Sequence, residues 1–91
     1  MHTVRDREKL LNRVKRIRGQ VTAVEGLLQD EADCEKVLQT LAACRGALNG
    51  LMAEVVEDHV RFHVIGPDAH PDSEQVRAAD QLVDIVRSYL K

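Results

Sequence analysis

Apolar residues recur at every third or fourth position through most of this 91-residue chain. This is the spacing of one face of an α-helix. It predicts three helices, over about residues 5–28, 34–65 and 74–90. The chain is too short for two independent cores, so we expect one all-α domain over residues 1–91, with a long central helix.

Residues that start and stop helices lie at the expected ends of these segments. Asp30 or Asp33 can cap the second helix, and Gly66 followed by Pro67 ends it. The third helix is expected to begin with a capping box formed by Asp72 and Gln75. Its apolar seam comprises Val76, Ala79, Val83, Val86 and Leu90.

The first helix combines an apolar seam with a basic stripe. The seam comprises Leu10, Val14, Ile17, Val21, Val24 and Leu28, and we expect Lys9, Arg13, Arg16 and Gln20 to face away from it. Residues 1–18 carry seven bases against two acids, whereas the rest of the chain carries six bases against thirteen acids. Such segregation suits a polyanionic partner, although a solvated basic face would give the same pattern.

Two histidines and a cysteine suggest a metal site. His59 and His63 lie four residues apart, so a helix places both rings on one face. Cys34 lies about 37 Å from His59 along the same helix. An antiparallel second copy would bring the thiol to the imidazoles, with its two-fold centre among residues 46–49. Thiolate and imidazole together favour borderline transition metals, and we expect a dimer with two shared sites.

Several alternatives remain open at this stage. Gly46 and Gly50 indicate either a kink in the central helix or a close helix crossing, and we favour the crossing. The histidine pair is also consistent with solvated side chains, and Cys34 with a metal-free thiol at a helix start. Cys44 is expected to be a small buried apolar residue. His70 is expected in a solvated loop.

The N-terminus offers further metal ligands. The α-amine of Met1, a backbone nitrogen and the imidazole of His2 form a compact chelator.

Other features exclude broad classes of protein. No segment resembles a signal peptide, no apolar run is long enough to span a membrane, and the two cysteines do not suggest a disulfide scaffold, so we expect a cytoplasmic protein. No nucleophile–base pair or phosphate-binding loop is apparent. We therefore expect no enzymatic activity.

Three motifs then carry a resemblance: RVKRIRGQ at residues 13–20, Cys34, and RGALNGLMAEV at residues 45–55 followed by His59. Together they resemble the CsoR/RcnR/FrmR family of bacterial repressors. The resemblance implies a disc-shaped tetramer, a dimer of dimers, that represses genes until an inducer binds. It also implies G/C-rich operator DNA read mostly through shape and backbone. The matching DNA-binding residues are Arg13, Lys15, Arg16, Arg18 and Arg45.

The set of His2, Cys34, His59 and His63 is similar to that of nickel and cobalt sensors, which control efflux genes. Ni(II) or Co(II) is therefore the expected inducer, and Zn(II) and copper are further ions for such donors in vitro. Phe62 stands where the well-known nickel/cobalt sensor has an acid. One alternative is a formaldehyde-responsive repressor that uses Cys34 and the N-terminal amine. Another is a metal-buffering protein without a DNA role.

Overall fold

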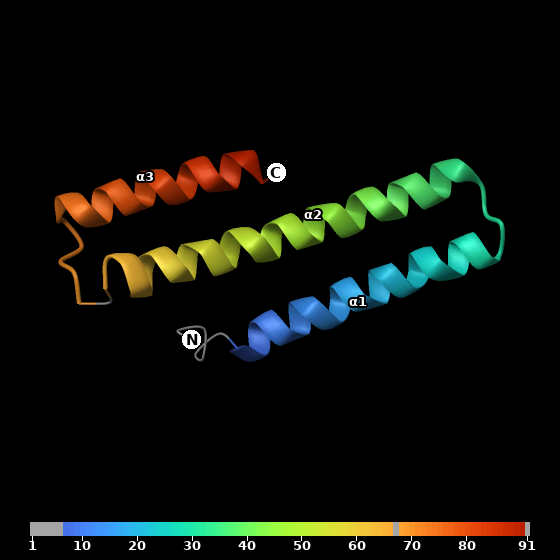
Figure 1. Cartoon of the computed structure of the whole chain (residues 1–91), viewed down its shortest axis with the longest axis horizontal. Coiled ribbons are helices and arrows are strands. Elements are labelled where there is room, and N and C mark those ends of the chain that lie inside the picture. The colour runs from blue at the N-terminus through green and yellow to red at the C-terminus, as the bar shows by residue number, and fades with distance from the viewer. Residues whose placement is uncertain (1–6, 67, 91) are drawn as a thin grey trace.

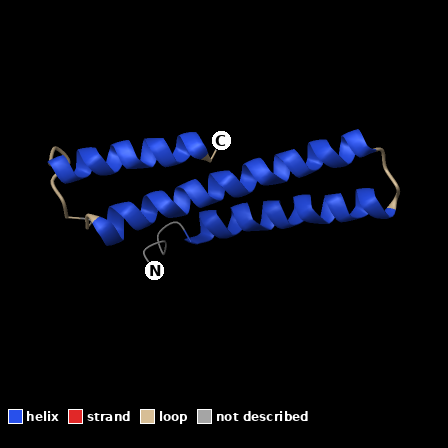
Figure 2. Ribbon diagram, turned by 45° about the horizontal axis from the view of Figure 1, so that its top comes forward, coloured by secondary structure: helices blue, strands red, loops and turns tan. Residues whose placement is uncertain are grey.

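The computed structural model describes residues 7–66 and 68–90, and every regular element in these ranges is helical (Figure 2). In chain order the elements are α1 (Arg7–Gln29), α2 (Cys34–His59), the π-helix η2 (Val60–Val64) and α3 (Glu74–Tyr89). α1 and α2 form an antiparallel hairpin, and α3 folds back along the C-terminal half of α2 (Figure 1). The prediction of an all-α chain with three helices and a long central one is confirmed.

The helix ends follow the capping chemistry of the sequence, with one shift. Asp33 caps α2, because its side chain accepts a hydrogen bond from the Lys36 amide at 2.9 Å. The prediction for α3 was wrong by one residue: Ser73, in an extended conformation, is the cap and accepts from the Val76 amide at 3.2 Å. The Asp72 amide instead donates to Nδ1 of His70, an exposed residue of the preceding loop, at 3.1 Å.

The central helix passes through both glycines as one α-helix and changes pitch only at its end. In η2 the Ile65 amide donates to the Val60 carbonyl at 3.1 Å, five residues back, which widens the last turn. Gly66 then ends the helical run in the left-handed region, with φ +88°. The helical segment thus spans residues 34–64, close to its expected bounds, with a π-turn that periodicity alone does not indicate.

The three helices form one thin layer, with Cα extents of 55 × 25 × 13 Å. α2 lies in the middle and contacts both neighbours. The buried apolar residues in the described ranges are Leu10, Ile17, Cys44, Ala53, Val60, Ala79 and Val83, and no large side chain there is fully buried. The expected burial is confirmed for Cys44 and, within the α3 seam, for Ala79 and Val83. Val76, Val86 and Leu90 of that seam are half-buried, so the core is shallow.

The apolar seam of α1 is only half covered. Leu10 and Ile17 are buried, whereas Val14, Val21 and Leu28 are 44%, 53% and 62% exposed. The expectation of a single buried seam was therefore wrong. Leu10 and Ile17 belong to a row that packs on α2, whereas Val14, Val21 and Leu28 form a second row that is exposed to solvent in the isolated chain. Exposed apolar rows of this length are typical of surfaces that bind another protein.

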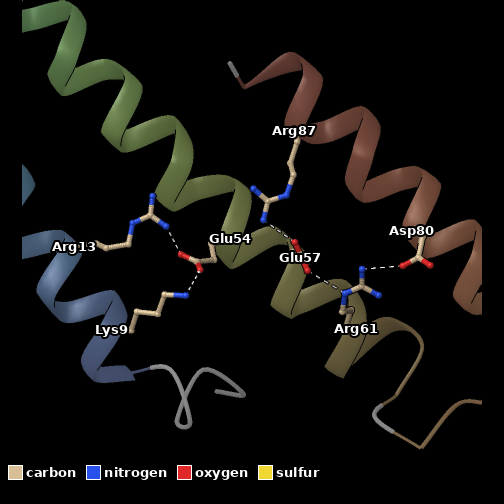
Figure 3. Close-up of polar contacts among 7 residues, drawn as sticks. All are labelled: Lys9, Arg13, Glu54, Glu57, Arg61, Asp80 and Arg87. Carbon is tan, nitrogen blue, oxygen red and sulfur yellow. Dashed lines mark hydrogen bonds and ion pairs between the residues drawn. The ribbon is translucent and has the colours of Figure 1, made fainter. Parts of the chain in front are cut away.

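Charged side chains join the end of α2 to α3. Glu57 accepts hydrogen bonds from Arg87 at 2.7 Å and from Arg61 at 3.2 Å, and Arg61 also pairs with Asp80 at 2.8 Å (Figure 3). The hydrogen bond from Arg87 is the largest influence on Glu57, and with Arg61 it lowers the pKa of the carboxyl below its ordinary 4.5 despite partial burial. This chain of ion pairs holds α3 against the histidine-bearing end of α2.

The lowered pKa of Glu57 predicts an acid-labile contribution to stability. A carboxyl whose pKa is lower in the folded state stabilises the fold above the unfolded pKa, and that contribution is lost as the pH falls through the folded pKa. We expect Glu57→Gln to lower the Tm by about 2–5 °C near neutral pH and by much less at about pH 3. Thermal unfolding followed by circular dichroism measures this. Glu25→Gln, which removes an exposed acid, is the control, and an equal decrease in Tm at both pH values for Glu57→Gln would contradict the prediction.

Candidate metal and nucleic-acid site

The two histidines expected to share a face do lie together. His59 is the last residue of α2 and His63 lies in η2, and both are exposed. Their rings stack with centroids 5.1 Å apart and an angle of 24° between planes. The π-turn between them therefore keeps both imidazoles on one side of the helix. Two such rings can supply two nitrogen ligands to one ion.

The expected thiol ligand lies at the opposite end of α2. Cys34 is the first residue of this helix and is exposed. The helical rise places it about 37 Å from His59. Across residues 7–66 and 68–90, no three His, Cys, Asp or Glu side chains gather into a cluster that could hold a metal. His2 and the Met1 amine lie outside the described residues. One chain thus presents separate halves of the predicted donor set.

An exposed apolar row joins these two halves along α2. Leu38, Leu41, Leu48, Met52 and Val55 are 58%, 46%, 47%, 54% and 36% exposed. With Cys34, Arg45 and His59 they occupy positions 34, 38, 41, 45, 48, 52, 55 and 59, where steps of four and three alternate. This spacing keeps all eight residues on one face of a helix. We call this row the α2 stripe; the thiol lies at one end of it and an imidazole at the other.

The basic residues of α1 lie at a hollow between α1 and α2. The hollow measures about 620 Å³ and is lined by Lys9, Asn12, Arg13, Arg16 and Glu54. We call it the basic hollow. Of the five residues expected to bind DNA, the structure brings Arg13 and Arg16 together here. Lys15 and Arg18 are exposed but do not line it, and Arg45 lies on the α2 stripe.

The predicted orientation of the basic stripe was wrong for two of its members. Arg13 and Gln20 are half-buried on the side of α1 that faces α2, and both line a smaller cavity of about 130 Å³ with Ala47. Arg13 turns inward because Glu54 of α2 accepts a hydrogen bond from its guanidinium (Figure 3). Lys9 pairs with the other oxygen of the same carboxylate at 3.2 Å.

Glu54 is ionised and well held in this position. Partial burial acts to raise the pKa of its carboxyl, but hydrogen bonds from Lys9 and Arg13, together with their charges, outweigh burial and lower the pKa below 4.5. Its side chain is 22% exposed. The basic hollow is therefore an electropositive surface with one fixed negative charge inside it.

Sequence and structure comparisons place the chain among known proteins. The profile of the family described as metal-sensitive transcriptional repressor matches residues 6–88, nearly the whole chain. The chain belongs to this family. Its members are regulators of transcription, not enzymes, as expected from the motifs.

Individual members of the family match over their full lengths. An uncharacterized protein in the bioA 5′ region of Serratia marcescens is 50% identical, covering 99% of this chain and 98% of the relative. The transcriptional repressor RcnR of Citrobacter koseri is 41% identical over the same shares of the two chains. Among solved structures, a variant of the formaldehyde-responsive regulator FrmR from Salmonella enterica serovar Typhimurium is 40% identical, with a TM-score of 0.69 over 98% of this chain and 99% of that one.

In the described ranges, none of the helices combines the length and the apolar character needed to cross a membrane.

Sequence reasoning missed Glu54 of this site, and it considered Gly50 only as a kink or a close helix crossing. Glu54 and Gly50 complete the surroundings of Arg13, but each lies about forty positions further along the chain. No local pattern reports such a contact. Their presence in the RGALNGLMAEV motif was the one available signal, because that motif marked the segment as functional without assigning roles to its members.

Proposed function

We propose that this protein is a repressor that binds operator DNA in its metal-free form and is released by Ni(II) or Co(II), so that metal efflux genes are expressed. The observation that carries this proposal is the arrangement of the α2 stripe. It is long, apolar and exposed, and it has an exposed thiol at one end and an exposed imidazole pair at the other.

One register pairs the stripe with an antiparallel copy of itself over its full length. If position 34 faces position 59 of the second copy, then 38 faces 55, 41 faces 52, and 45 faces 48. Every apolar member of the stripe then meets another member, and the two-fold axis passes between positions 46 and 47. An isologous pairing of this kind is what a symmetric dimer requires. The register needed to bury the apolar surface is therefore the one that brings Cys34 to the histidines.

The donor set favours nickel or cobalt. A thiolate with imidazoles suits borderline metals, whereas a second thiolate in place of His63 would favour Cu(I). We propose that Cys34 of one copy and His59 and His63 of the other hold the ion. His2 and the Met1 amine complete the site, and thereby connect the N-terminus that precedes α1 to the metal.

DNA binding is assigned to the basic surface of α1. Arg13 and Arg16 line the basic hollow with Lys9, while the exposed Lys15 and Arg18 add phosphate contacts on neighbouring sides of the helix. A disc-shaped tetramer of two dimers would repeat this surface along G/C-rich operator DNA. Recognition would rest on backbone and shape. Arg45 is the least supported of the five residues, because the proposed register places it opposite Leu48 in the dimer.

Metal and DNA are linked through α1. We propose that metal binds more tightly to a conformation in which the basic hollows are poorly positioned to contact DNA. Metal binding then lowers operator affinity, and DNA binding lowers metal affinity by the same factor. Couplings of about 1–3 kcal/mol are typical of allosteric proteins, which corresponds to an affinity change of about 5–150-fold.

Arg16→Ala tests the assignment of the DNA surface. Arg16 lines the basic hollow and is exposed, so we expect the substitution to weaken operator binding about tenfold. The slope of log K against log salt should become shallower by about 1 for each DNA phosphate that the variant no longer neutralises. Fluorescence anisotropy on operator DNA at several salt concentrations measures both quantities. Arg77→Ala, which removes an exposed base from α3, is the control. Equal affinities for the two variants would exclude Arg16 from the DNA surface.

A formaldehyde-responsive repressor is the second candidate. The likeness to FrmR, at 40% identity, favours it, and Cys34 is an exposed thiol of the kind that reacts with formaldehyde. The two functions differ in inducer. Anisotropy titrations of the protein–operator complex with Ni(II), Co(II) and formaldehyde decide between them: release by metal at concentrations that saturate one site per chain supports the first, and release by formaldehyde alone supports the second.

A further inference from the structure

The single acid of the basic hollow lies where a phosphate would be expected to bind. The carboxylate of Glu54 pairs with Lys9 through one oxygen and with Arg13 through the other (Figure 3). Arg16 lines the same hollow. In the free protein, two of the three bases are therefore engaged by a negative charge that belongs to the protein itself.

The surface of α2 is shaped to hold Arg13 in this position. A Cβ atom added to Gly50 would lie only 2.7 Å from Nη2 of Arg13, so the absence of a side chain leaves room for the guanidinium. Gly50 precedes Glu54 by one helical turn and is on the same side of α2. The guanidinium thus rests in a notch with a glycine at one end and a carboxylate at the other, and the Arg13 side chain is only 29% exposed.

We propose that Glu54 is an internal competitor for DNA phosphates, which holds Lys9 and Arg13 in the free protein and releases them when DNA binds. This inference rests on the proposed function. Carboxylate and phosphate are both anionic acceptors that a guanidinium binds in similar geometry, so they exclude one another at the same donors. The competition lowers affinity for every polyanion. DNA whose phosphates fit several hollows at once still binds tightly, whereas DNA that engages few hollows does not, and this limits non-specific binding.

Glu54→Gln tests the competition directly, because it removes the charge and keeps the shape. We expect the variant to bind both operator and random-sequence DNA about 3–10-fold more tightly than the wild type. We also expect the dependence of log K on log salt to become steeper by about 1, since the hollow gains one net positive charge. Glu25→Gln, which removes an exposed acid of α1 outside the hollow, corrects for the general increase in positive charge.

A double-mutant cycle shows whether the effect passes through the bases that Glu54 holds. In an Arg13→Ala background, Glu54→Gln should tighten binding by less than it does alone, because only Lys9 remains to be released. Equal tightening in the two backgrounds would contradict the exchange of partners. Glu54→Gln binding no more tightly than Glu25→Gln, or more weakly than the wild type, would overturn the proposal.

A measurement on the wild-type protein avoids any effect of substitution on folding. The ¹³C resonance of the Glu54 carboxyl, titrated with and without operator DNA, reports the pKa of this group among Lys9, Arg13 and Arg16. We expect the pKa to be higher in the complex, where phosphates have taken its partners, and an unchanged pKa would contradict the exchange. A wild-type protein that binds no DNA would instead refute the repressor function, whereas tight wild-type binding with no response at Glu54 refutes only this inference.

Discussion

Cys34→Ala should leave operator binding intact and abolish release by metal. Cys34 lies at the end of the α2 stripe, far from the basic hollow, so its removal leaves the phosphate-binding surface unchanged. The proposed metal site, in contrast, loses its only thiolate. We expect the change in operator affinity on adding Ni(II) to drop from the typical range of about 5–150-fold to less than about twofold. Anisotropy titrations with operator DNA, with and without Ni(II), measure this ratio.

Cys44→Ala is the matched control, because it removes the other thiol of the chain. Cys44 is buried and Cys34 is exposed. The control variant should lose some thermal stability, since a buried side chain becomes smaller, and should keep the full response to metal. A Cys34→Ala protein that still leaves the operator on addition of Ni(II) would remove this thiol from the mechanism.

Leu41→Glu should separate the protein into monomers and so abolish both DNA binding and metal binding. In the proposed register Leu41 faces Met52 of the second copy, and the two-fold axis places the substitution twice in each interface. A buried unpaired carboxylate costs about 3 kcal/mol or more, which weakens association more than about 100-fold for each site. Analytical ultracentrifugation gives the mass directly. Ala43→Glu adds the same charge to an exposed position on another side of α2 and should not change the mass.

A compensating substitution makes this prediction specific to the register. Adding Met52→Lys to Leu41→Glu places an ammonium on the second copy opposite each new carboxylate. We expect the double variant to recover at least part of the dimer, because the opposite charges then meet in pairs. Recovery by the same lysine at position 48 in place of position 52 would point to a different pairing of the two helices and would contradict the proposed one.

Local signals in the sequence predicted the helices well. The apolar spacing located all three, and Asp33 caps α2 through a bond to an amide three residues away, which is a local interaction. The burial of Ala79 and Val83 followed from the seam of α3. His59 and His63 share a face because four residues make one turn, and the π-turn does not separate their rings.

Features that depend on distant contacts or on a second copy were beyond sequence patterns. The periodicity of apolar residues predicted one seam on α1. However, an apolar row on a helix does not reveal whether the residues that pack against it belong to the same chain. Val14 and Val21, two members of that seam, are exposed in the isolated chain. Arg13 was expected to face away from the core because its helical position places it on the basic stripe, yet Glu54, 41 residues away, turns it inward. The shift of the α3 cap from Asp72 to Ser73 reflects two adjacent residues that can both cap a helix.

Subunit complementation can show whether one metal site takes its ligands from two copies of the chain. Cys34→Ala and a His59→Ala, His63→Ala double variant should each fail to give the thiolate-to-metal charge-transfer absorption of a Co(II) complex. After the two are unfolded together and refolded as a mixture, mixed dimers hold one site with both an intact thiol and intact imidazoles. We expect the absorption to return to about a quarter of its wild-type intensity, because half of randomly paired dimers are mixed and each of these has one of its two sites intact. A mixture that stays without this absorption, from proteins shown to exchange subunits, would contradict a site shared between two copies.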